Sequence, residues 1–433
     1  MEHLLRGLEG RRNNMDISAY FMQKTYNLKD IEFVNNELTF KDLIDLLKNE
    51  EVKSLVGDTY EIIEDNIISI DKIDIIYSIV RKYSTKFETH RILCEEKDTK
   101  VEFVQNNEKD VFFILNNCAT EDGEYLGRVE ALSKYDSIHL FYDDRKLSQH
   151  INYIKSKHRD QKLLDSINNS WIEYYKRNSK ISKDRLFRVL RDNERGDYFA
   201  KSFNTIKYKE YGIAETFVLT ILELNKLKES TGSKLEILSL AISEAKIEII
   251  ISTNKEHYIN GLGRLKASIT VRNKDQGNTS LGFYATINFN LEKEIGENIF
   301  LYPNRNIDDI NFKKTFQHTI SAKKFIDNHT IINELINEMD RVYDDIHFLK
   351  DKHTPDQLRA KIFERVGSTR GIFKDVKELS DLFRKDVDNE ISNIKQLLKL
   401  CSKAEILEME YDTKFHLRYL ISNVLLYGKN NLE

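Results

Sequence analysis

Four apolar runs between positions 235 and 290 constrain most strongly what this chain can fold into. The last run alternates, so that Phe283, Ala285, Ile287 and Phe289 fall on one face, as in a strand with one buried side. The runs occupy 235–242, 246–252, 265–271 and 281–290, and polar connections separate them. Successive strands with short connections pair antiparallel, so we expect a central, largely antiparallel sheet.

Helical patterns surround this region. Residues 211–226 repeat apolar side chains at helical spacing and predict one helix packed on the sheet. Further helices are expected from 308 to 432. Thr354 starts one of them, because proline follows it at the first helical position and Gln357 stands three residues later. The pattern as a whole predicts an α+β fold with a C-terminal helical bundle.

The first half of the chain mixes short strands and helices. Residues 39–47 predict a helix capped by Thr39, whereas 73–80 suit a helix and a strand equally. Strands are expected at 100–104, 111–115 and 138–142, with turns at 116–117 and 122–123. A strand at 185–190, a turn at 191–196 and a returning strand at 198–203 are assigned to the central domain.

The chain has 433 residues, which is more than one ordinary domain uses. We divide it where the pattern changes. The units are an N-terminal α+β domain (1–144), a charged helical bridge (145–180), a central β-rich domain (181–305) and a C-terminal helical region (306–433). Only two prolines and 16 glycines occur, so short polar turns are expected in place of long linkers.

Cysteine use and the lack of long apolar runs bear on the compartment. Cys94, Cys118 and Cys401 form no CxxC pair, and their number is odd, which favours free thiols in a reducing compartment. Residues 1–14 are polar and basic, unlike a signal peptide, and no run approaches the roughly 18 apolar residues of a spanning helix. We therefore expect a cytoplasmic protein with no membrane partner.

The net charge is −4, so any attraction to nucleic acid must come from a local patch. Basic residues cluster at 155–159, 176–195 and 201–209, with aromatic residues between them, a combination that suits single-stranded nucleic acid. The candidate nucleic-acid-binding residues are Lys176, Arg185, Arg188, Arg191, Arg195, Lys201, Lys207 and Lys209. The alternative interpretation is a solvated charged face over a buried aromatic core, because four acidic residues between 184 and 197 dilute the patch.

Glu244 and Lys246, one residue apart, are the candidate catalytic residues. Restriction-type nucleases place Glu and Lys in this way at the end of a strand, where carboxylates bind Mg²⁺ and the lysine orients water. Glu236 or Asp197 would supply the second acid. The alternative interpretation places Glu244, Lys246 and Glu248 on the solvent face of an alternating strand. No metal-ligand spacing occurs, so no cofactor is expected except Mg²⁺ under the nuclease hypothesis.

A further feature of the sequence is the order in which several segments follow one another along the chain. The strand-turn-strand RLFRVLRDNERGDYFA from Arg185 precedes a helix, and LSLAISEAKIEIII from Leu238 follows it. Then come GLGR and, from Ala267, ASITVRNKDQGNTSLGFYATI. Over residues 181–370 this order resembles the phage/plasmid-like protein family of unknown function (domain of unknown function 932), although the family's Arg-Leu-Val-Cys-x-Asn-like strand has no counterpart here. The family is encoded on phages, plasmids and conjugative elements, so the resemblance implies a mobile-element context.

Together these patterns predict a non-catalytic protein of a phage, prophage or plasmid. It would bind nucleic acid or another protein in phage–host conflict, including antiviral defence, or in the handling of mobile-element DNA. One alternative is a metal-dependent nuclease centred on Glu244 and Lys246. The other is an assembly protein that forms a homo-oligomer through its C-terminal helices.

Overall fold

The computed structural model describes residues 24–28, 36–60, 63, 65–103, 111–135, 137–178, 184–204, 207–259, 263–276, 280–290, 298–303, 312–339, 353–385 and 391–430. The prediction for residues 1–14 lies outside these ranges. In the part of the chain that is described, no helix is both long enough and apolar enough to cross a bilayer.

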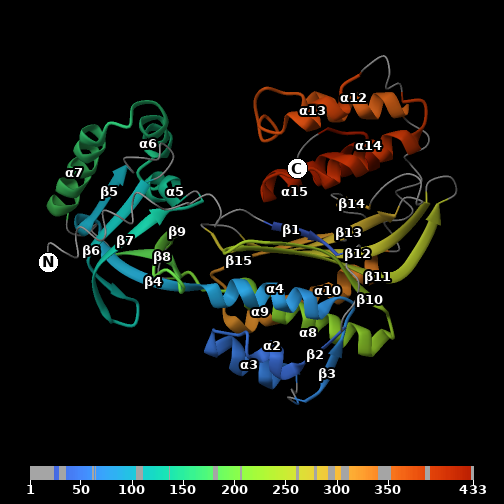
Figure 1. Ribbon diagram of the computed structural model, residues 1–433, viewed down its shortest axis with the longest axis horizontal. Helices are drawn as coiled ribbons and strands as arrows, with labels where there is room; N and C mark the ends of the chain where they lie inside the picture. Colours follow the sequence, from blue (N-terminus) through green and yellow to red (C-terminus); the bar gives the residue numbers. More distant parts are fainter. Residues whose placement is uncertain are drawn as a thin grey trace.

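A large antiparallel sheet forms the centre of one half of the molecule (Figure 1). Its described strands are β1 (Lys24–Asn27), β10 (Leu235–Ile242), β11 (Lys246–Ile259), β12 (Gly263–Lys274), β13 (Ser280–Asn290), β14 (Ile299–Leu301) and β15 (Lys313–Gln317). They pair in the order β1-β10-β11-β12-β13-β14, and β15 pairs with the rest of β13. The four predicted runs thus form the middle of the sheet, as expected, whereas β15 falls in a region predicted to be helical.

Helices cover both faces of the large sheet, which confirms the α+β class (Figure 1). One face carries α4 (Ile73–Lys86), α8 (Ile213–Thr231), α9 (Ala322–His329) and α10 (Ile331–Glu338). Beyond them lie β2 (Glu37–Thr39), α2 (Phe40–Ile44), α3 (Glu50–Tyr60) and β3 (Ile67–Ser69). The other face carries α12 (Pro355–Val366), α13 (Lys377–Phe383), α14 (Ile394–Ile406) and α15 (Tyr411–Tyr427). The predicted C-terminal helices are therefore divided between the two faces.

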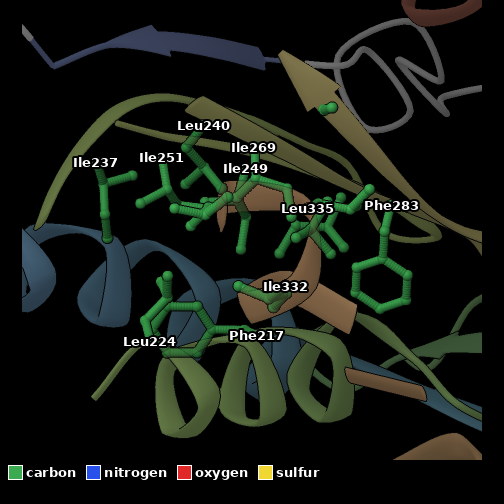
Figure 2. Close-up of a cluster of buried hydrophobic side chains, with 14 of the residues drawn as sticks. Phe217, Leu224, Ile237, Leu240, Ile249, Ile251, Ile269, Phe283, Ile332 and Leu335 are labelled. Carbon is green, nitrogen blue, oxygen red and sulfur yellow. The ribbon is translucent and has the colours of Figure 1, made fainter. Parts of the chain in front are cut away.

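The face of the large sheet toward α8 is an apolar core (Figure 2). Side chains of β10–β13 point toward Phe217 and Leu224 of α8 and toward Ile332 and Leu335 of α10. All four are buried, and each such side chain stabilises the fold by about 1.5–3 kcal/mol. Helix α8 lies between this sheet and the outer helices, which explains why it is apolar around most of its circumference.

The opposite face of the sheet is covered as well, and it carries buried charged side chains beside two small apolar clusters. Arg418 of α15 donates to Glu248 at 2.6 Å, and Arg272 of β12 pairs with the same carboxylate at 3.0 Å. Glu244, Lys246 and Glu248 are all at least nine-tenths buried, so the solvent face expected for them is wrong. An alternating pattern identifies two faces of a strand, but the C-terminal helices decide whether the polar face meets water.

A second sheet forms a small barrel. Its described strands are β4 (Phe87–Glu95), β5 (Thr99–Phe103), β6 (Val111–Thr120), β7 (Tyr125–Ser133), β8 (Asp184–Asp192) and β9 (Tyr198–Asn204). The order is β4-β8-β9-β7-β6-β5, and a further antiparallel pairing of β4 with β6 closes the ring. The pairing of β7 with β9 is parallel. Phe113, Val129, Phe187 and Ala200 lie in the core of the barrel.

Strands β8 and β9 belong to this barrel and not, as predicted, to the central sheet. Their apolar pattern identifies them as strands, but pairing with the distant β4 and β7 decides which sheet they join. The boundaries predicted at 144 and 181 therefore fall inside one hydrogen-bonded sheet. The segment predicted as a bridge packs on the barrel as well, because Ile151, Ile154 and Leu164 lie in its core.

Residues 138–142 form α5 (Ser137–Asp143) and not the predicted strand. Ile138, Phe141 and Tyr142 fall at helical spacing and all pack into the barrel core, so burial on one side favours the helix. The run at 73–80, which suited both states, is helical in α4 for the same reason. The turn expected at 116–117 is instead a bulge in β6, where Asn117 has a φ of 50°.

Candidate nucleic-acid interface

The barrel carries a helical cover made of α6 (Ser148–Tyr153), a π-helical turn (Ile154–His158) and α7 (Gln161–Arg177). Asp160 caps α7 by accepting from the N–H of Leu163 at 3.1 Å. The side-chain amide of Gln161 donates to the Val101 carbonyl and accepts from the Phe103 N–H, both at 2.9 Å. These bonds fasten the start of α7 to β5 and leave the outer face of the helix in solvent.

Arg145 links the cover to the barrel from beneath, and Arg185 shares its carboxylate partner. Arg145 pairs with Glu96 at 2.6 Å, and Arg185 pairs with the same carboxylate. The guanidinium of Arg145 also lies 5.7 and 5.8 Å from the ring centroids of Trp171 and Tyr175. Arg185 therefore pairs with a carboxylate, and Trp171 and Tyr175 pack against Arg145. These three residues fit the alternative interpretation, a charged layer over an aromatic core, better than a nucleic-acid-binding surface.

The cover carries both exposed cations and exposed aromatic rings. We call Tyr153, Lys157, Lys162, Tyr174, Lys176 and Arg177, all exposed, the basic cover. The two tyrosines are 54% and 42% exposed. Between residues 145 and 201 the chain has 15 Lys or Arg against seven Asp or Glu, although its net charge is −4. The cover itself, residues 148–177, has six Lys or Arg against three Asp or Glu.

The other predicted binding residues lie on different elements. Arg191 and Arg195 are exposed around the turn between β8 and β9, and Lys207 and Lys209 are exposed after β9. The N–H of Lys209 donates to the His318 carbonyl at 2.7 Å, which places this segment beside the large sheet. Of the predicted residues, Lys176 alone is part of the basic cover. Tyr153 and Lys162 were missed, although their position on the polar side of a helical pattern is visible in the sequence.

Arg188 and Lys201 are buried in an ionic junction between the barrel and the large sheet. Lys201 of β9 lies 2.7 Å from Glu210 and 2.6 Å from Asp275, and Arg188 of β8 pairs with both carboxylates. The hydroxyl of Tyr208 donates to Asp275 at 2.7 Å. This cluster connects two barrel strands to the segment that follows β12. Its two cations are fully enclosed, so they are unavailable to phosphates.

The charges within the junction stabilise one another. Burial opposes ionisation of Asp275, but Arg188 and Lys201 beside it bring its pKa well below the usual range. The ring of His318 stacks on Tyr208 with centroids 5.1 Å apart, and burial lowers the pKa of His318 to about 4. The junction therefore holds an ionised carboxylate and a neutral imidazole near neutral pH.

Glu244 and Lys246 both lie beside Tyr135 but have different polar partners. Glu244, in the turn before β11, accepts from the hydroxyl of Tyr135 at 3.0 Å, and burial raises its pKa to about 7. Lys246 lies 3.9 Å from Asp412 of α15, and burial lowers its pKa. Glu236, one candidate for the second acid, pairs with Lys72 toward the other end of β10.

The remaining requirement of a nuclease is a metal site. Asp197, the other candidate acid, precedes β9 in the barrel. Across the described residues, no group of three or more His, Cys, Asp or Glu side chains is placed to hold a metal ion.

Neither a protein family, nor a curated protein, nor a solved structure matches this chain, so no relative assigns a function to these residues. The phage/plasmid-like resemblance stays a prediction.

Proposed function

We propose that this chain binds single-stranded nucleic acid through the basic cover of its barrel. Lysine and arginine side chains there would contact phosphates, and Tyr153 and Tyr174 would stack on bases. The observation that carries the proposal is the joint exposure of these cations and rings on one helical layer. Exposed rings suit unpaired bases, because the bases of a duplex are already stacked on one another.

The strand order of the barrel supports the same class of ligand. Strands β4 and β5 lie end to end along β6, with three residues between them, and act as one interrupted strand. We count β4 and β5 as the first strand and β6, β7, β8 and β9 as the second to fifth. The first strand then pairs with the second and the fourth, and the third pairs parallel with the fifth. The helices of the cover lie between the third and fourth strands. OB-fold barrels share this order and bind oligonucleotides in many proteins, although on the face of their second and third strands and the adjoining loops and not on the helices. This support is a fold-level analogy, so the site must carry the argument.

The salt dependence of binding tests the proposal. The full-length protein is titrated against a labelled single-stranded oligonucleotide and a matched duplex at several salt concentrations, and fluorescence anisotropy is recorded. Each phosphate contact contributes about −0.7 to the slope of log K against log salt for a single strand. Replacing Lys157, Lys162 and Lys176 by glutamate should reduce the magnitude of that slope by about 2.

The control is a charge-matched variant on the other half of the molecule. Lys374, Lys377 and Lys399 are exposed in the α13–α14 region, and replacing all three by glutamate changes the net charge equally. This variant should keep most of the affinity. Equal losses in both variants, or wild-type binding that ignores salt, would contradict the proposal. Tyr153→Ala and Tyr174→Ala should weaken single-strand binding more than duplex binding, by about 1–3 kcal/mol for each stacked base.

A mobile-element setting is proposed on sequence grounds alone. The binding of another protein, a Glu244–Lys246 nuclease and assembly through the C-terminal helices remain predictions. No contact among the described residues favours one of them specifically. Nucleic-acid binding by the basic cover is therefore the function tested first.

A further inference from the structure

Two buried cysteines lie in the barrel core, on the two strands whose pairing closes the barrel. Strand β4 pairs antiparallel with β6 through Ile92 opposite Thr120 and Leu93 opposite Ala119. Cys94 and Cys118 are the next residues of the two strands, where the bulge at Asn117 interrupts β6. Both side chains belong to the barrel core, so they point to the same side of the sheet. The proposed nucleic-acid interface uses neither residue.

The register of the two neighbouring pairs favours the spacing that a disulfide needs. Directly opposed residues of antiparallel strands have Cα atoms about 4.5 or 5.5 Å apart, and disulfides span about 4.4–6.8 Å. The Cys94 thiol lies 3.5 Å from the carbonyl oxygen of Asn116, two residues before Cys118 in the sequence. Both thiols are free in this structure. Bond formation therefore requires side-chain rotation and at most a local adjustment of the bulged backbone beside Cys118.

We propose that Cys94 and Cys118 form a redox-responsive disulfide across β4 and β6. The two thiols lose two protons and two electrons as the sulfur–sulfur bond forms. A peroxide would accept the electrons and leave as water, or a small-molecule disulfide would accept them and leave as two thiols. The bond would hold the barrel closed at the position where β4 meets β6. This inference is independent of nucleic-acid binding.

The surroundings of the thiols determine how fast the bond forms. Burial raises the pKa of Cys94 to about 12 and also raises that of Cys118. Thiolate is the reacting species, so both residues react slowly in the closed barrel at neutral pH. Oxidation should accelerate as pH rises, and also in urea below the unfolding transition, where the barrel opens more often. The pair therefore responds to sustained oxidation and not to a brief pulse.

Counting free thiols tests the proposal on the full-length protein. The protein is incubated with oxidised glutathione at pH 7 and pH 8.5, with and without low urea, then denatured, alkylated and analysed by mass spectrometry. A parallel sample is reduced, unfolded and refolded in a glutathione redox buffer, so that slow access cannot hide the product. The expected product has one alkylated cysteine, Cys401, and a linked peptide pair containing Cys94 and Cys118. A reducing agent should restore three alkylation sites.

Cys401 supplies the matched control, because it is a buried cysteine on α14 of the C-terminal helices. Cys401→Ser should form the same disulfide, whereas Cys94→Ser and Cys118→Ser should form none. The oxidised protein should also show a higher melting temperature in the fluorescence of Trp171, reversed by reduction. Three free thiols in both samples, a disulfide that involves Cys401, or glutathione adducts alone would overturn the inference.

Discussion

The substitution Asp275→Asn tests whether the ionic junction holds the barrel to the large sheet. The Asp275 side chain is 3% exposed, and its partners Arg188 and Lys201 are at least as deeply buried. Asparagine keeps the shape and an acceptor for the Tyr208 hydroxyl but removes the charge. Two buried cations then face Glu210 alone. Breaking a buried pair in this way costs about 3–5 kcal/mol.

Urea unfolding measures this cost. Trp171 is the only tryptophan in the chain, so its fluorescence reports the barrel, while far-ultraviolet circular dichroism reports the whole molecule. With a slope of about 2 kcal/mol/M, a loss of this size moves the midpoint down by roughly 1.5–2.5 M. Adding Lys201→Met to the variant should recover part of the loss, because it removes one of the uncompensated charges.

The control is Asp412→Asn. Asp412 also faces lysine and arginine side chains, with Lys274 at 2.8 Å and Arg272 at 3.5 Å, but it is 40% exposed. Solvent screens such pairs, so this variant should lose no more than about 1 kcal/mol. A loss below about 1 kcal/mol for Asp275→Asn, or equal losses in the two variants, would refute the reasoning.

The pH dependence provides a second check. The folded chain holds the pKa of Asp275 below its value in the unfolded chain, which is about 4. The stabilisation is therefore complete above about pH 4 and is lost as the pH falls through the folded pKa. The difference between wild type and Asp275→Asn should stay constant from about pH 6 to 8 and shrink in acid.

Two further substitutions follow from single contacts. Burial raises the pKa of Glu244 from 4.5 to about 7. As the pH rises from 4.5 to 7, this carboxyl group ionises in the unfolded chain before it ionises in the folded chain, so the wild type loses stability over that pH range. Glu244→Gln should have the same free energy of unfolding as the wild type at pH 4.5 and a free energy of unfolding about 3 kcal/mol higher at pH 8. Melting temperatures at both pH values measure this difference, and a difference that does not change with pH would contradict it. Thr354→Ala removes the cap of α12, where the Thr354 hydroxyl accepts from the Gln357 N–H at 3.3 Å, and should cost about 1 kcal/mol. Urea midpoints measure that loss, and Thr354→Ser, which keeps the hydroxyl, should restore most of it.

Features that depend on neighbouring residues were predictable from the sequence. Thr39 and Thr354 cap α2 and α12 as expected, because a capping hydroxyl acts within three residues of its own position. The strands β10–β13 were found by their apolar runs. The turn at 191–196 was also found, with Gly196 at a φ of 73° as the turn requires.

The candidate site was predictable only in part. A run of lysines and tyrosines is visible in the sequence, but the exposure of each side chain depends on what packs over it. Lys176 is exposed on α7, whereas Lys201 faces Asp275, 74 residues further along the chain. Tyr135 of the barrel lies beside both Glu244 and Lys246, and Asp412 of α15 lies near Lys246, although both residues are far from the pair in sequence.

The sequence by itself determined the α+β class, most strands of the large sheet and the starts of two helices. These features arise from periodicity and from capping over a few residues. Tertiary structure alone decided that β8 and β9 join β4 and β7, that 138–142 is helical, and which cations are buried. Those outcomes depend on contacts between residues far apart in the chain, and only the assembled core brings such residues together.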